Sequence, residues 1–172
     1  MHSKEFDLMP TRTNPDKSLN EIVENCEKGH RTWTELIVQA NQHKVQGLFD
    51  QALELYTKAL EEVIHLVEVI ELAIELKIPA LHHFTLTTQS LAETYESISL
   101  PDEAERLLLT HFICLKKITQ CLKTPLVIRD LARQEIYHSR RYLIDLYNRN
   151  ERKERAEIHA QRCHELYYSL LA

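Results

Sequence analysis

The side chains best suited to metal chemistry lie near the C-terminal end of the chain. His159 and Cys163 are four residues apart, so on a helix they would share one face, and His164 follows directly. Imidazole nitrogen and thiolate sulfur are ordinary zinc ligands, but a closed zinc site needs four ligands. Because the missing ligands would have to come from elsewhere, and because these positions match the packing face of a final helix, we interpret them as structural residues.

A second metal pattern is the Glu-x-x-His pair, which supplies ligands in di-iron helical bundles. Glu27 with His30 and Glu62 with His65 have this spacing, but a di-metal centre also needs two further carboxylates facing the two pairs. The chain has no Gly-rich phosphate loop, Gly-x-Ser-x-Gly elbow or His-Glu-x-x-His helix. We therefore predict a non-catalytic protein with no cofactor and no metal, and retain a helical-bundle metalloenzyme as the third hypothesis.

The remaining histidines and cysteines have simpler interpretations. His82 and His83 are adjacent and would point in different directions on a helix, whereas Cys114 and Cys121, seven residues apart, fit one core stripe. The four cysteines are not closely paired, so we interpret them as reduced thiols.

Charge and hydropathy point to a cytoplasmic protein. The N-terminal residues 1–7 are charged and lack the apolar run of a secretory signal, and acidic residues interrupt the most apolar stretch, 63–80. The formal net charge of -5 gives no overall attraction to nucleic acid. We expect a protein or peptide partner, with no nucleic acid and no membrane.

The elements that must position these residues are helices. Only two glycines and five prolines occur in 172 residues, which favours an all-α domain with long helices. Residues 1–17 are predicted to form a flexible tail, and residues 18–172 a single domain. We place the helix boundaries from the apolar periodicity and from local signals at the helix ends. These signals are a capping-box spacing at Ser18 and Glu21, a left-handed stop at Gly47 and an N-cap at Asp50. The expected helices are a short one at 18–28 and six longer ones at 31–46, 50–77, 79–98, 101–122, 125–148 and 151–170.

An internal repeat organises these helices. Segments 39–43, 91–95 and 143–147 lie 52 residues apart and lead to Ala52, Ala104 and Ala156. Self-similarity at a fixed period is typical of stacked helical arrays. We therefore predict three antiparallel helix hairpins at about 31–77, 79–122 and 125–170.

The order Leu91-Ala92-x-x-Tyr95, a short turn and then Ala104 resembles the tetratricopeptide repeat, as does the run from Gly47 through Ala52 and Tyr56 to Ala59. The resemblance covers about residues 31–172 and implies a right-handed superhelical array with a concave groove lined by the first helix of each hairpin. Such a domain acts as a protein-interaction module, here for a peptide or helical segment. The groove positions it implies are Ile37, Asn41, Lys44, Gln89, Glu93, Glu96, His138, Arg141, Tyr142, Asp145 and Arg149.

An alternative function is self-assembly into a homodimer or regulatory unit. The last expected helix carries apolar side chains and no polar helix follows it, although terminal repeats need a polar outer face for solubility. The candidate oligomer face consists of Leu166, Tyr167, Leu170 and Leu171.

Overall fold

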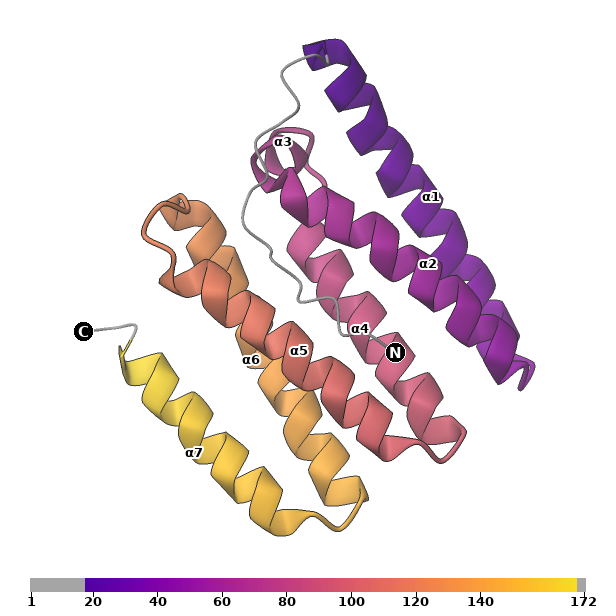
Figure 1. Cartoon of the computed structure of the whole chain (residues 1–172), viewed down its shortest axis with the longest axis vertical. Helices are drawn as coiled ribbons and strands as arrows, with labels where there is room; N and C mark the ends of the chain where they lie inside the picture. The colour runs from indigo at the N-terminus through magenta and orange to yellow at the C-terminus, as the bar shows by residue number, and fades with distance from the viewer. Residues whose placement is uncertain (1–17, 170–172) are drawn as a thin grey trace, which may run out of the picture.

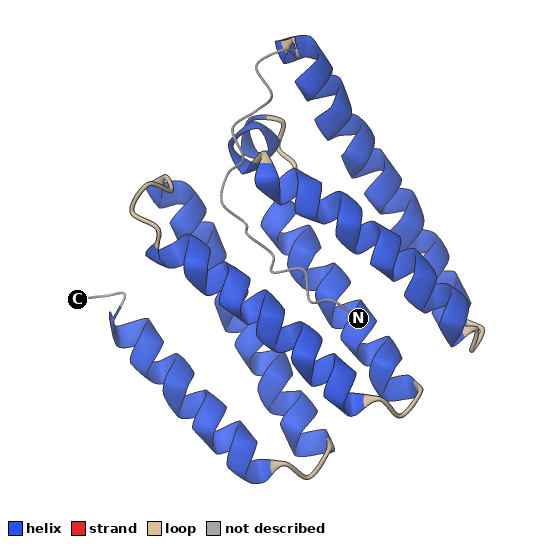
Figure 2. Ribbon diagram, in the orientation of Figure 1, coloured by secondary structure: helices blue, strands red, loops and turns tan. Residues whose placement is uncertain are grey.

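The computed structural model describes residues 18–169, with side chains through residue 161, and every regular element in this range is a helix (Figures 1 and 2). The predicted all-α class is therefore confirmed for the described residues. None of their helices has both the length and the apolar character needed to span a membrane. The tail predicted for residues 1–17 lies outside the described range. The helices are α1 (Leu19–Val45), α2 (Phe49–Glu68), α3 (Ile70–Glu75), α4 (Ala80–Ser97), α5 (Pro101–Gln120), α6 (Leu126–Arg149) and α7 (Lys153–Ser169).

The start of the chain differs from the prediction in one respect. The backbone N–H of Glu21 donates to Ser18 Oγ at 3.3 Å, as the predicted cap requires. However, the expected break between residues 28 and 31 was wrong, because α1 continues through Gly29. A helical glycine costs about 1 kcal/mol relative to alanine, but the buried residues Cys26 and Trp33 lie on either side of Gly29 and hold one packed stripe together.

The second hairpin arm also differs from the prediction. The single helix expected at 50–77 is interrupted at Val69, whose φ of -110° and ψ of 36° leave the helical region, so that α2 and α3 are separate. The break lies beside the β-branched residues Val67 and Ile70, which have low helix propensity. Asp50, expected as an N-cap, lies in the first turn of α2, and Leu48 occupies the cap position.

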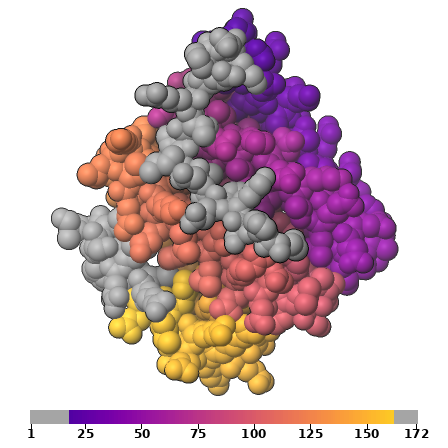
Figure 3. Space-filling view, viewed as in Figure 1, coloured from indigo at the N-terminus to yellow at the C-terminus, as the bar shows by residue number. Residues whose placement is uncertain are grey.

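The helices pack mainly on their neighbours in the chain. In Figure 1, α2, α5 and α7 lie toward the viewer, and α4 and α6 lie behind them. Helix α4 has the most partners, since it contacts α2, α5 and α6 over several residues each. In the space-filling view the colours follow chain order across the molecule, and side chains fill the space between the ribbons (Figure 3).

Helix α4 is buried over most of its surface, apart from a stripe that includes His82, Leu86 and Glu93, and its buried sides carry many threonines. Thr85, Thr87, Thr88 and Thr94 are all 2 % exposed or less. Each hydroxyl donates to the backbone carbonyl four residues earlier, at 2.7 to 3.1 Å, so none of these four hydroxyl protons is left unbonded. The threonines thus let a polar sequence occupy the centre of the domain.

Three turns spaced 52 residues apart share one backbone geometry, which the turn at Lys77 before α4 also adopts. Gly47, Ser99 and Glu151 have φ values of 75°, 62° and 58°, and each lies just after a helix. In each turn the next residue's N–H bonds to the carbonyl five residues earlier, for example Leu100 N to Tyr95 O at 2.9 Å. This is the Schellman motif, which closes a helix on a left-handed residue. The spacing seen in the sequence is therefore also present in the backbone.

Replacing the two non-glycine residues of these turns should stabilise the protein. Ser99 and Glu151 are exposed and left-handed, so Ser99→Gly or Glu151→Gly should each raise the free energy of unfolding by about 0.5 to 1 kcal/mol. The measurement is urea unfolding followed by circular dichroism.

Gly47→Ala is the matched control. An added Cβ would meet no atom within 4 Å, so the expected loss of about 1 kcal/mol reports the backbone conformation alone. Destabilisation by Ser99→Gly and Glu151→Gly would contradict the assignment of a left-handed backbone to these two residues.

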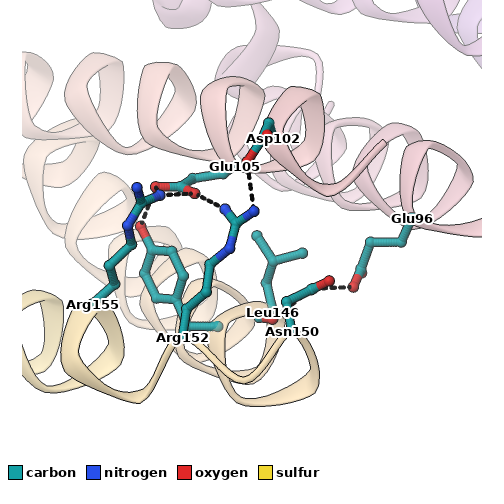
Figure 4. A network of polar contacts seen from close by, with 8 residues as sticks. Glu96, Asp102, Glu105, Leu146, Asn150, Arg152 and Arg155 are labelled. Carbon is teal, nitrogen blue, oxygen red and sulfur yellow. Dashed lines mark hydrogen bonds and ion pairs between the residues drawn. The ribbon is translucent and has the colours of Figure 1, made fainter. Parts of the chain in front are cut away.

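A charged network fixes the turn between α6 and α7 to the start of α5 (Figure 4). The Glu105 carboxylate accepts bonds from Arg152 at 2.5 Å, from Arg155 at 2.6 Å and from the Tyr147 hydroxyl at 3.2 Å. Arg152 also binds Asp102 at 2.6 Å. Burial, and then the neighbouring Glu105 charge, raise the pKa of Tyr147 to about 12. Glu105 is therefore the acceptor on which α5, α6 and α7 converge.

The two carboxylates of this network should contribute unequally to the stability of the protein. The Glu105 side chain is 13 % exposed and the Asp102 side chain 83 %. Glu105→Gln should lower the free energy of unfolding by about 2 kcal/mol, because it weakens three partially buried bonds. Asp102→Asn should cost less than about 1 kcal/mol. Equal losses in thermal unfolding would contradict this ranking.

Candidate functional site

Several charged groove positions implied by the sequence are paired with each other in the structure. Lys44 of α1 binds Glu93 of α4 at 2.5 Å, and Arg149 of α6 binds Glu96 of α4 at 2.7 Å. Glu96 also accepts a bond from Asn150 at 3.2 Å (Figure 4). The Glu96 carboxylate raises the pKa of Arg149. The structure therefore brings α1, α4 and α6 together along one layer, with these charges joining neighbouring helices.

Two other predicted groove residues take part in internal contacts. Ile37 is partly buried against the core around Ala40, Ala52 and Tyr56. The Tyr56 hydroxyl donates to Asn41 Oδ1 at 2.5 Å. Both residues therefore help to hold α1 on α2.

The other five predicted groove residues surround one cavity between α4 and α6. It has a volume of about 250 Å³. Arg141 and Asp145 are exposed and form no hydrogen bond or ion pair with the described residues. Burial raises the pKa of Tyr142, and Glu93 adds to this effect. The predicted residues that line the cavity are Gln89, His138, Arg141, Tyr142 and Asp145.

The sequence did not single out Glu135, which lies at the end of this cavity. His82 Nδ1 lies 3.2 Å from Glu135 Oε1, and the two residues line both this cavity and a second one of about 230 Å³. His82 is half exposed and His83 is buried, so their expected divergence is confirmed. In the sequence, a glutamate on a polar helix cannot be distinguished from one that faces solvent. Only the packing of α4 on α6 therefore reveals the contact between His82 and Glu135.

Two buried histidines near the centre are neutral. His83 stacks on Trp33 with ring centroids 3.6 Å apart, and burial, reinforced by His30, lowers its pKa to about 4. His111 lies between Thr85 and Ser139, each 3.2 Å away, and burial lowers its pKa to about 3.

The bonds around His111 fix its tautomer. The Thr85 hydroxyl proton goes to Leu81 O, so Thr85 Oγ1 accepts from His111 Nε2–H, and Nδ1 accepts from Ser139. The neutral imidazole thus joins α4, α5 and α6 with no unbonded nitrogen.

This arrangement makes stability depend on pH. The folded pKa of His111 lies below its unfolded value of 6.5, so its contribution is complete above pH 6.5 and is lost as pH falls toward 3. Between pH 7.5 and 5.5 we expect His111→Gln to lose about 1 kcal/mol less unfolding free energy than the unmodified protein. Urea titrations at both pH values measure the unfolding free energy of the two proteins. Equal losses between the two pH values would contradict the lowered pKa of His111.

The candidate metal ligands do not converge where their side chains are described. His159 is buried and contacts the rings of Phe112 and Tyr147, while His30 stacks on His83. Among the described side chains, no three or more His, Cys, Asp or Glu residues are grouped so as to hold a metal ion. The side chains of Cys163 and His164 lie outside the described residues, as do those of the candidate oligomer face, Leu166, Tyr167, Leu170 and Leu171.

The described cysteines are free thiols. Cys114 lies in the core as predicted, and burial raises its pKa. Cys121 lies instead at the end of α5, where a bond from Thr124 lowers its pKa, so the prediction of a shared core stripe was wrong for Cys121.

Comparisons with known proteins give no family for this chain. No protein-family model, curated protein or solved structure matches it. The candidate site therefore has to be interpreted from its own geometry.

Proposed function

We propose that this protein is a non-catalytic, cytoplasmic interaction module that binds a segment of a partner protein in the groove between α4 and α6. The observation that carries the proposal is the combination of a cavity with unpaired charges. Arg141 and Asp145 border the cavity and have no ion-pair partner among the described residues, whereas Lys44 and Arg149 are already paired. Unpaired charges beside a concave surface can bind a ligand without first breaking an internal ion pair.

The arrangement of helices supports a tetratricopeptide-like array as the framework. The left-handed turns recur at residues 47, 99 and 151, and Ala52, Ala104 and Ala156 are buried five residues after each turn. Helices α1, α4 and α6 are the first arms of the three hairpins, and ion pairs join α1 to α4 and α4 to α6. In such an array the first arms line the concave surface, and the cavity is lined by residues of two of these arms, α4 and α6.

A charge exchange tests the proposal. Arg141→Glu combined with Asp145→Lys keeps the net charge but reverses its pattern at the cavity. We expect affinity for a captured partner segment to fall at least about tenfold, because two complementary contacts become repulsive. The partner would be identified by affinity capture from the native host, and its binding segment then measured by fluorescence polarisation. The melting temperature should stay nearly unchanged, because both side chains are exposed.

Helix α7 offers a matched control. Lys153 and Glu157 are exposed, are also four residues apart, and have no ion-pair partner among the described residues. Lys153→Glu combined with Glu157→Lys should leave affinity unchanged. The groove would be ruled out as the binding site if the charge exchange on α6 left the affinity unaltered. The same conclusion would follow if the charge exchange on α7 lowered the affinity equally.

A further inference from the structure

Two cavities lie end to end along the groove, with His82 and Glu135 between them. The first reaches His138 and Arg141 on α6, and the second lies near Leu131. At a rise of 1.5 Å per residue, their centres are about 10 Å apart along α6. That separation matches side chains three residues apart in a polyproline II segment, in which three residues complete one turn and both side chains point the same way. With volumes of about 250 and 230 Å³, each falls below the usual size of a small-molecule site.

The two cavities differ in chemistry. Aliphatic side chains, including Ile70, Ile74 and Leu131, surround the second cavity. Leu131 is 37 % exposed, and Val127, one helical turn earlier, is 56 % exposed. The first cavity is lined largely by residues that carry a polar or charged side chain. One end of the groove therefore suits an aliphatic side chain and the other a polar one.

Glu135 determines which kind of polar side chain a ligand should place in the groove. It is 8 % exposed, and its Oε2 has no hydrogen-bond partner among the described residues. Its other oxygen contacts only the half-exposed His82. A buried acceptor without a donor is destabilising, and more so when it is charged. Glu135 lines both cavities, so a donor bound in either one lies beside its carboxylate.

The lining also favours an extended ligand over a helical one. An extended segment leaves backbone N–H and C=O groups unpaired, and these need polar partners. Gln89, Arg141 and Asp145 lie along the first cavity and can supply them. A helix satisfies its own backbone and is bound by apolar grooves.

We propose that the groove recognises an extended peptide in the polyproline II conformation, in which a large aliphatic residue and a lysine or arginine lie three positions apart. This inference rests on the proposed function. The aliphatic side chain enters the cavity beside Leu131, and the basic side chain donates to Glu135. Recognition thus combines burial of apolar surface with a charge-assisted hydrogen bond to a carboxylate that has an unused oxygen.

Selection from a displayed library of random peptides tests the proposal with the full-length protein. Enriched peptides should share an aliphatic and a basic residue three positions apart. In a synthetic peptide from this set, replacing the basic residue by glutamine should weaken binding about tenfold. Against Glu135→Gln the same replacement should have little effect, because the acceptor charge is gone. Leu131→Glu should weaken both peptides.

The outcomes separate the two proposals. Groove-dependent peptides are those that lose binding to the Arg141→Glu and Asp145→Lys variant. If such peptides are enriched, but replacing their basic residue by glutamine does not weaken binding, the inference about Glu135 is wrong and the proposed function stands. If no groove-dependent peptide is enriched, both are overturned. The peptide substitution needs no protein variant, so the test does not depend on the folding of Glu135→Gln.

Discussion

The burial of α4 over most of its surface is the constraint on which the rest of this structure depends. A helix in that position has only a narrow solvent-facing stripe for polar residues, yet α4 places several threonines on its buried sides. Their hydroxyls bond within the helix, and Thr85 and Thr87 also accept bonds from His111 and Trp33. These bonds extend from α4 to α1 and α5, so the neighbouring helices are held in register by polar groups as well as by apolar contact.

The same constraint explains where a binding site can form. Helices α2 and α5 cover most of α4, but the side facing α6 is covered less completely and leaves two cavities there. His82 lies on that side and reaches Glu135, whereas the adjacent His83 points inward and stacks on Trp33. The groove is thus the part of the central helix that its neighbours leave accessible.

The sequence predicts the fold class and most helix ends, because glycine scarcity, proline positions and apolar periodicity act locally. It fails where packing overrides local preference: α1 continues through Gly29, and the second arm breaks at Val69. Five predicted groove residues do surround one cavity. The pairing of Lys44 with Glu93 depends on how two helices are aligned, which periodicity within either helix does not specify. Glu135 has no sequence signal at all.

The two kinds of charged residue in this layer have different consequences for binding. A ligand that contacted Lys44 or Glu96 would compete with an existing ion pair and gain little, since one interaction replaces another. Arg141 and the free oxygen of Glu135 have no partner to lose, so a complementary group adds an interaction there. The ion pairs therefore fix the spacing of the helices, and selectivity is concentrated in the short stretch where charges of opposite sign remain unpaired.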